Sequence, residues 1–245
     1  MMIYERNGFC VTQGADMTEI AGSGNDEGYG WKPMWGEMRV VQHIVPNIKS
    51  NQSVVDLAGA VGRVSFPFSM RGHEVTIVDT NLRLLKLGNE MRTRAGAKQA
   101  QILNSDIRNV TRDHVGSQVG AVVAHDALMF MGKEDANKVI ASLPKLLGDE
   151  GGYVYLNALA TLSPIYRQPD RYGAMVVGNN TLKVRAGCHG GTIESGFFEF
   201  GEINARLALS GGVIINSETV ERGLGGPFVD HMVIARFSPD ALIRD

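Results

Sequence analysis

Residues 54–79 read VVDLAGAVGRVSFPFSMRGHEVTIVD, and this stretch decides the fold. The apolar run at 53–59 ends in small residues, which predicts a buried strand that enters a tight turn. We expect a helix from about 62 to 71 and a second strand at 73–79. Only tiny side chains let a ligand approach the backbone of such a turn, and the helix that follows offers free N–H groups. The pattern therefore predicts a ligand site at the turn.

Two acids mark this stretch, one near the end of each strand. Asp79 stands where an acid accepts hydrogen bonds from ribose hydroxyls, at the carboxyl edge of an open α/β sheet. Asp56 precedes the turn, where its charge suits a cationic ligand group and opposes a pyrophosphate. The turn contains neither the G-x-G-x-x-G string of dinucleotide sites nor the G-x-x-x-x-G-K-[ST] string of P-loops. These residues favour a nucleoside that carries an ammonium or sulfonium group over NAD.

Strands and helices alternate through the next part of the chain, which predicts a parallel sheet with right-handed crossovers. Apolar residues at helical spacing indicate an amphipathic helix at 34–48, before the first strand. The other expected elements are helices at 81–96 and 133–148, and strands at 101–106, within 120–130 and at 151–159.

The pattern changes after residue 160. Residues 172–187 predict a β-hairpin whose turn lies around Gly178, Asn179 and Asn180. The remaining expected elements are a helix at 198–212 and strands at 213–221 and 231–237.

The expected organisation is one α/β domain at 49–245, with an insertion at about 160–197, after an N-terminal arm and lid helix at 1–48. Hydrophobic residues make up 44% of the 245 residues, which is enough for a full core. Lys and Arg number 24 against 26 Asp and Glu, and this balance disfavours a protein that grips a phosphate backbone. With two cysteines, no signal peptide and no apolar run long enough to span a bilayer, we predict a reduced, cytoplasmic protein.

The order of these segments resembles the class I S-adenosylmethionine (SAM)-dependent methyltransferases, closely over residues 50–160 and more loosely over 198–237. The first motif of that family, D-x-G-x-G-x-G, stands here as DLAGAVG at 56–62, with alanines in place of two glycines. The resemblance implies a Rossmann-like three-layer α/β sandwich. Its mostly parallel seven-stranded sheet would have an antiparallel edge strand, for which 231–237 is the candidate, and would carry the inserted hairpin.

The resemblance also implies SAM as the cofactor. Asp79 would bind its ribose, Asp106 would contact the adenine amino group, and Ile107 would pack on the ring. His125, in AHDALMF after the fourth strand, would lie near the methionine part. The full implied cofactor-binding set is Asp56, Ala58, Gly59, Ala60, Gly62, Asp79, Thr80, Asp106, Ile107, His125, Tyr29 and Trp31.

Each of these residues also has a structural interpretation. Asp106 fits an N-cap about as well as an adenine contact. Tyr29 and Trp31 would attract a sulfonium through cation–π interactions worth roughly 0.5–2 kcal/mol, in the region that covers the methionine end in the family.

Three residues are candidates for catalysis. His125 follows a buried strand and has the residue type for a general base, although an ordinary loop role fits it equally. His189 and Tyr172 lie in the insertion, which commonly shapes the acceptor pocket in the family. The sequence indicates no metal site.

The favoured function is in-line transfer of the methyl group of SAM to a nitrogen or oxygen of a small-molecule acceptor. An alternative keeps SAM but attacks its aminocarboxypropyl chain, by transfer or cyclisation, and releases methylthioadenosine. A non-catalytic SAM-fold protein and a NAD-dependent enzyme are weaker alternatives. The sequence disfavours a nucleic-acid substrate, because no N-P-P-Y-like segment appears on the fourth strand, and it indicates no membrane partner. The acceptor and the oligomeric state are not predicted.

Overall fold

The central sheet has the strand order β3–β2–β1–β4–β5–β10–β9 in a computed structural model that describes residues 35–185, 192–221 and 228–242. Strands β1 to β5 run parallel, whereas β10 runs antiparallel to both β5 and β9. The strands are β1 Ser53–Leu57, β2 Val75–Asp79, β3 Gln101–Asn104, β4 Val119–Ala124, β5 Gly152–Ala160, β9 Val213–Glu221 and β10 Val229–Phe237.

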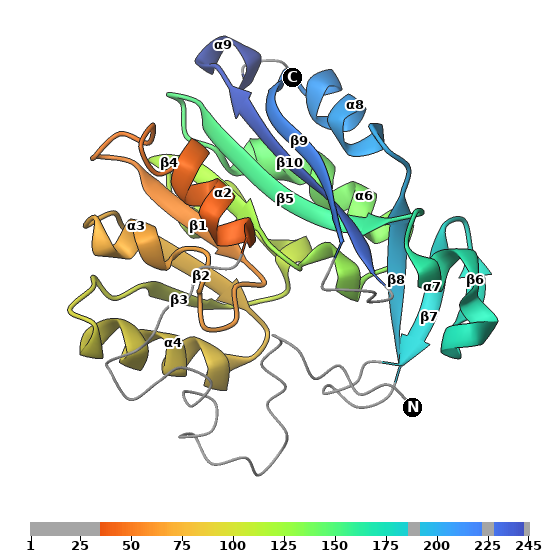
Figure 1. Ribbon diagram of the computed structural model, residues 1–245. Coiled ribbons are helices and arrows are strands. Elements are labelled where there is room, and N and C mark those ends of the chain that lie inside the picture. Colours follow the sequence, from red (N-terminus) through yellow and green to blue (C-terminus); the bar gives the residue numbers. More distant parts are fainter. Residues whose placement is uncertain (1–34, 186–191, 222–227, 243–245) are drawn as a thin grey trace.

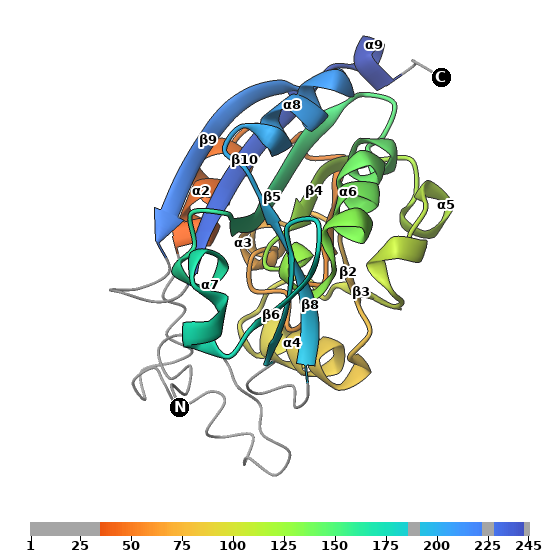
Figure 2. The same cartoon turned by 90° about the vertical axis from the view of Figure 1, so that its right-hand side faces the viewer.

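Helices cover both faces of this sheet, so that the molecule has three layers (Figures 1 and 2). The helices α2 (Trp35–His43), α3 (Phe66–Met70) and α4 (Leu82–Arg94) pack on one face. The helices α5 (Arg112–Val115), α6 (Lys133–Ser142) and α8 (Glu202–Leu209) pack on the other. Because both faces are covered, β4 (VGAVVA) is buried at every position and reads as one apolar run.

The predicted antiparallel strand is confirmed, and it lies one strand in from the edge. β10 is buried at nearly every position, whereas exposed and half-buried residues alternate along β9. A strand that is covered by neighbours and by helices on both faces is apolar throughout, so the apolar β10 lies inside and the more polar β9 forms the edge. Arg39 of α2 fixes this edge through two hydrogen bonds to Glu218, with nitrogen–oxygen distances of 2.6 and 2.9 Å.

The insertion forms a small antiparallel sheet of β6 (Met175–Gly178), β7 (Thr181–Arg185) and β8 (Thr192–Phe198). The predicted hairpin is confirmed as β6 and β7. The strand β8 was not predicted, and the helix expected at 198–212 begins only at Glu202. The last residues of β8 pair in parallel with the end of β5, beyond the end of the shorter β4. The small sheet therefore lies next to the carboxyl end of the central sheet.

Each of the five predicted helices is shorter than expected, and neighbouring turns explain this for α2 and α3. α2 ends at His43, and turns carry the chain past Pro46, whose nitrogen cannot donate a helical hydrogen bond. α3 spans only Phe66–Met70, because residues 58–65 form the turn described below. The remaining short elements are η1 Ile107–Asn109, η2 Leu128–Phe130, η3 Leu143–Leu146, α7 Pro164–Arg167, η4 Pro169–Tyr172 and α9 Pro239–Leu242.

None of the helices in the described ranges combines the length and the apolar character needed to cross a lipid bilayer.

Candidate functional site at the carboxyl edge of the sheet

The turn after β1 contains two non-glycine residues in the left-handed region. Ala58 has φ 54° and Ala60 has φ 50°. An L-residue in this region costs roughly 1–2 kcal/mol, because its Cβ comes too close to the following carbonyl oxygen. The two alanines that replace motif glycines therefore stand at the positions where glycine would relieve strain, and other contacts must hold the turn.

The glycines that remain in the turn are required for close packing. A Cβ on Gly59 would lie 2.7 Å from Cγ of Asp56 and 2.7 Å from Cγ2 of Ile77. A Cβ on Gly62, where φ is 70°, would lie 2.6 Å from Nη2 of Arg92. The turn thus lies directly on β2 and α4, with no room for a larger residue at either position.

Asp79 ties the turn to the start of α4. Its Oδ2 accepts a hydrogen bond from the Ala60 N–H at 3.0 Å, and its Oδ1 accepts one from the Asn81 N–H at 2.8 Å. The Gly59 N–H donates to the Val78 carbonyl at 3.1 Å. Asp79 therefore lies at the carboxyl end of β2 with its carboxylate orientation fixed, next to the exposed Thr80.

Asp56 lies beneath the turn and is only 2% exposed. Its Oδ2 accepts a hydrogen bond from Ser65 Oγ at 2.6 Å. Burial raises the pKa of Asp56 to about 6, although the Ser65 hydrogen bond and the charge of Arg92 act in the opposite direction. Asp56 thus contacts protein groups, and it faces the turn from below rather than from the open edge.

Asp106 and Ile107 follow β3 at the same edge. Asp106 caps η1 by accepting a hydrogen bond from the Arg108 N–H at 2.9 Å, and its Oδ2 also binds the Arg108 guanidinium at 2.6 Å. The hydrogen bonds from Arg108 lower the pKa of Asp106. Ile107 is buried in the core on the α6 side of the sheet. The capping role that the sequence allowed for Asp106 is therefore present.

His125 follows β4 and contacts a buried tyrosine. Its Nδ1 lies 2.7 Å from the Tyr155 hydroxyl, and the two rings stack with centroids 5.8 Å apart. The Tyr155 hydroxyl also lies 3.5 Å from Sδ of Met232, on β10. Nε2 of His125 lies 3.8 Å from Oδ2 of Asp126. These contacts hold the imidazole between the sheet and Asp126.

Asp126 belongs to a polar chain that sequence reasoning missed. It adopts a left-handed conformation with φ 57°, and its side chain is 33% exposed. The side-chain amide of Asn157, on β5, makes two hydrogen bonds to Asp126. It accepts one from the Asp126 N–H at 2.6 Å and donates one to Oδ1 of Asp126 at 2.7 Å. The same amide nitrogen donates to Oδ2 of the fully buried Asp230 at 2.9 Å. The available signal was a polar residue inside an apolar strand, as in YVYLNALA and VDHMVIA.

The other predicted residues do not join this group among the described residues. Tyr172 lies in η4 and packs on the small core of the insertion. His189, Tyr29 and Trp31 lie outside the residues that the structure describes.

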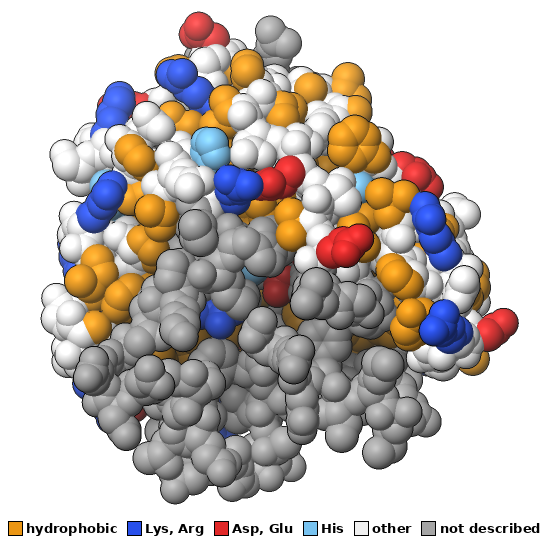
Figure 3. All heavy atoms as spheres, in the orientation of Figure 1, with side chains coloured by type: hydrophobic (Ala, Val, Ile, Leu, Met, Phe, Trp, Pro, Cys, Tyr) orange, Lys and Arg blue, Asp and Glu red, His pale blue; other side chains and the backbone are white. Residues whose placement is uncertain are grey.

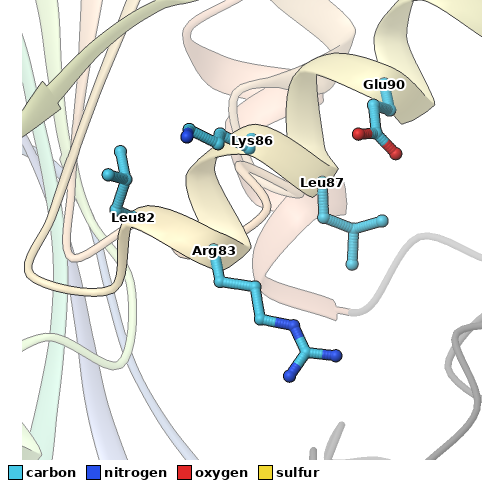
Figure 4. A pocket seen from close by; sticks show the side chains of 5 residues that line it. All are labelled: Leu82, Arg83, Lys86, Leu87 and Glu90. Carbon is cyan, nitrogen blue, oxygen red and sulfur yellow. The ribbon is translucent and has the colours of Figure 1, made fainter.

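A surface pocket lies on the outward face of α4 (Figure 4). Its lining residues all come from that helix, and none belongs to the predicted site. The lining residues are Leu82, Arg83, Lys86, Leu87 and Glu90. The opposite face of α4, which carries Gly88 and Arg92, packs on the turn after β1.

Comparison with known proteins finds similarity in structure alone. The sequence matches no protein-family model and no curated protein. A SAM-dependent methyltransferase from Methanosarcina mazei is similar with a TM-score of 0.63 and 17% identity, over 79% of this chain and 95% of that one. The magnesium protoporphyrin IX methyltransferase from Synechocystis, with bound S-adenosylhomocysteine, is similar with a TM-score of 0.59 and 16% identity. The match covers 83% of this chain and 84% of that one.

A third similar structure is the 1,6-didemethyltoxoflavin N1-methyltransferase from Burkholderia thailandensis, with bound 1,6-didemethyltoxoflavin and S-adenosylhomocysteine. It gives a TM-score of 0.54 and 15% identity, over 85% of this chain and 80% of that one. At such identities the likeness shows the fold. The predicted Rossmann-like architecture is therefore confirmed, and the chain shares it with SAM-dependent methyltransferases.

Proposed function

We propose that this chain, which has the fold of SAM-dependent methyltransferases, binds SAM and transfers its methyl group to a nitrogen or oxygen of a small molecule. The observation that carries the proposal is the turn after β1, where left-handed Ala58 and Ala60 are held against the carboxylate of Asp79. This places a tight backbone turn and a fixed acid side by side at the carboxyl edge of a parallel sheet, where open α/β folds bind nucleosides.

The chain's residues fit such a ligand. A carboxylate offers about four acceptor positions, and Asp79 uses two of them for backbone N–H groups, which orients the others for ribose hydroxyls. The carboxyl of Asp56 lies under the turn, where its negative form favours an ammonium bound above without touching it. Asp106 and Ile107 remain the proposed contacts of adenine, and Thr80 remains a proposed cofactor-binding residue beside Asp79. Tyr29 and Trp31 remain the proposed cover of the methionine end.

The proposed acceptor site lies at the ends of β4 and β5. When bound, SAM supplies a methyl group that is already activated by the positive sulfur. What the chain must add is alignment of the acceptor and removal of its proton. Asp126, held by Asn157, and His125, held by Tyr155, are the groups proposed for the proton, with Nε2 and Oδ2 3.8 Å apart. His189 and Tyr172 stay as candidates from the insertion.

A small molecule is the proposed acceptor class. The β6–β8 sheet lies next to the carboxyl end of β4 and β5, and we propose that it limits the size of the acceptor. The described part of the surface in Figure 3 carries acidic and basic side chains intermingled, rather than one continuous basic face. Two proteins of this fold are named for small substrates, magnesium protoporphyrin IX and 1,6-didemethyltoxoflavin. A cytoplasmic location stays a prediction.

The test is calorimetric titration with S-adenosylhomocysteine, followed by product analysis. Wild type should bind, and Asp79→Ala should lose at least tenfold in affinity, because charge-assisted hydrogen bonds to the ribose are removed. Asp113→Ala, in the exposed first turn of α5, is the matched control and should bind as wild type does. Absence of binding to wild type would overturn the proposal.

Product analysis separates the remaining alternatives. Incubation with SAM and a panel of amines and phenols should yield S-adenosylhomocysteine and a methylated acceptor. Methylthioadenosine as the product would instead indicate attack on the aminocarboxypropyl chain. Binding without any turnover of SAM across the panel would support the non-catalytic alternative.

A further inference from the structure

We propose that Arg92 is a positioning residue for the cofactor turn at residues 58–62, and that it acts on the reaction by holding this turn with Ala58, Ala60 and Gly62 in the left-handed region. The inference rests on the proposed SAM function for its consequences in catalysis. Whether Arg92 holds the turn can be tested in the protein without any ligand.

The guanidinium of Arg92 is fully buried and donates in several directions at once. Nη1 donates to the Val61 carbonyl at 2.9 Å, and Nη2 donates to the Gly62 carbonyl at 2.7 Å. Nη2 also lies 3.1 Å from Ser65 Oγ, and Nε lies 3.1 Å from Ser69 Oγ. One side chain of α4 thus binds two successive carbonyls of the turn and two hydroxyls of the segment that leads into and through α3. Only a planar guanidinium offers this fixed fork.

Gly88 shows independently that α4 packs closely against the turn. It stands one helical turn before Arg92, so both residues lie on the same face of the helix. A Cβ on Gly88 would lie 2.8 Å from the carbonyl carbon of Val61, too close for any side chain. The helix backbone therefore approaches Val61 directly at Gly88, and Arg92 binds the oxygen of the same residue.

The strain of the turn explains why such a clamp is needed. Ala58 and Ala60 favour negative φ when nothing opposes it, and such a change would rotate the peptide groups between them. Asp79 holds the Ala60 N–H on one side, and Arg92 holds the Val61 and Gly62 carbonyls on the other. With glycines at 58 and 60 the same shape would need less support. The buried arginine and the two alanines are thus complementary features of one turn.

The experiment combines Arg92→Met with two controls. Calorimetry measures the affinity for S-adenosylhomocysteine, and hydrogen exchange measures protection of the amides of residues 56–66 in the free protein. Ile140→Ala creates a cavity at α6, on the opposite face of the sheet from α4, so it lowers stability while leaving Arg92 and its hydrogen bonds in place. Arg71→Met removes an exposed arginine by the same substitution.

We expect Arg92→Met to weaken binding about tenfold or more, because the carbonyls of Val61 and Gly62 lose their charged donor. Exchange at residues 56–66 should rise by more than the loss of global stability gives in Ile140→Ala, whereas Ile140→Ala and Arg71→Met should leave the affinity near wild type. The triple variant with Ala58→Gly and Ala60→Gly should regain most of the lost affinity, while the same glycines in wild type should change it little. A residue with a merely structural role would show no such rescue.

Arg92→Lys gives a second route if the Met variant does not fold. It keeps the positive charge near Asp56 but cannot form the fork, so it should show the same loss and the same rescue. The inference is overturned if Arg92→Lys and Arg92→Met bind and exchange as wild type does, if Ile140→Ala weakens binding equally, or if the glycines give no rescue. Failure of wild type to bind S-adenosylhomocysteine overturns the proposed function instead, and the exchange data still decide whether Arg92 holds the turn.

Discussion

Asp56 is a residue whose burial makes the stability of the folded chain depend on pH. The pKa of its carboxyl rises from 3.8 to about 6, chiefly through burial. The folded state therefore keeps a proton that the unfolded chain loses near pH 4. As pH rises from about 4 to about 6, the free energy of unfolding falls, and the pKa difference corresponds to about 3 kcal/mol. A carboxyl that costs stability at neutral pH is consistent with a functional position.

Replacing the carboxyl of Asp56 tests directly whether the free energy of unfolding falls as pH rises. Asp56→Asn keeps an oxygen for Ser65 but cannot ionise, so its stability relative to wild type should increase by about 3 kcal/mol between about pH 4 and pH 7. Urea denaturation at a series of pH values measures this difference. Asp113→Asn, which is exposed, should show no such trend. A difference between Asp56→Asn and wild type that stays constant with pH would contradict the burial argument.

The alanines of the turn lead to a second prediction on stability. Ala60→Gly removes strain of roughly 1–2 kcal/mol but adds freedom to the unfolded chain worth roughly 0.5–1 kcal/mol. We expect a net gain of about 0.5–1 kcal/mol in the free energy of unfolding. Ala95→Gly, at the C-cap of α4 where φ is −83°, should lose stability instead. Equal losses at both positions, measured by urea denaturation, would show that Ala60 is not strained.

The sequence predicted individual residues of the site unequally. Asp79 was predictable because strand order and the turn determine its position. The roles of Arg92 and of the Asp126–Asn157–Asp230 chain were not predictable, because the residues that form their main hydrogen bonds are 30 or more positions apart in the sequence. Two of these residues are polar groups within apolar strands, a pattern that indicates a buried contact without naming the partner.

Lys133 connects three elements around the insertion. Its Nζ donates to the Phe197 carbonyl of β8 at 2.7 Å and to Glu202 of α8 at 2.6 Å, and it lies 3.6 Å from the centroid of the Phe198 ring. Burial lowers the pKa of Lys133, whereas the hydrogen bonds from Lys133 and Arg206 outweigh burial and lower the pKa of Glu202. Lys133 therefore holds β8 and α8 against the start of α6.

Removing this lysine should loosen the insertion. Lys133→Met leaves the Phe197 carbonyl and Glu202 without their charged donor, and we expect a loss of about 2–3 kcal/mol in the free energy of unfolding. Lys138→Met, on the exposed side of the same helix, should leave the free energy of unfolding near that of wild type. Urea denaturation measures both. A loss as small for Lys133 as for Lys138 would mean that the contact contributes little.

The elements that the sequence predicted well are those whose burial is continuous. β1, β4 and β5 read as apolar runs because helices cover both faces of the sheet. The strand β8 (TIESGFF) lacked such a run, since its first residues are exposed or half-buried and its pairing partners are β7 and the far end of β5. The helix expected from 62 was wrong at its start, because Arg92 and Ser65 bind the carbonyl of Gly62.

At the scale of the whole molecule, both halves of the sheet contribute residues to its carboxyl edge. Asp79 and the turn belong to the α4 half, and Asp126 with Asn157 and Asp230 belong to the β4–β5–β10 half. The strand order changes direction at β1 and β4, which is where open α/β sheets leave a crevice for ligands. A ligand bound there joins the two halves and should stabilise the entire chain.

This linkage gives a prediction that uses the intact protein alone. At about one hundred times its dissociation constant, S-adenosylhomocysteine should stabilise the folded state by about 2.7 kcal/mol, which raises the Tm of a chain of this size by about 5–10 °C. NAD should give no shift, because its pyrophosphate would lie over the buried carboxyl of Asp56. Asp79→Ala should abolish the shift while Asp113→Ala retains it. A shift with NAD and none with S-adenosylhomocysteine would assign this edge of the sheet to a dinucleotide instead, since stabilisation follows whichever ligand binds the folded chain.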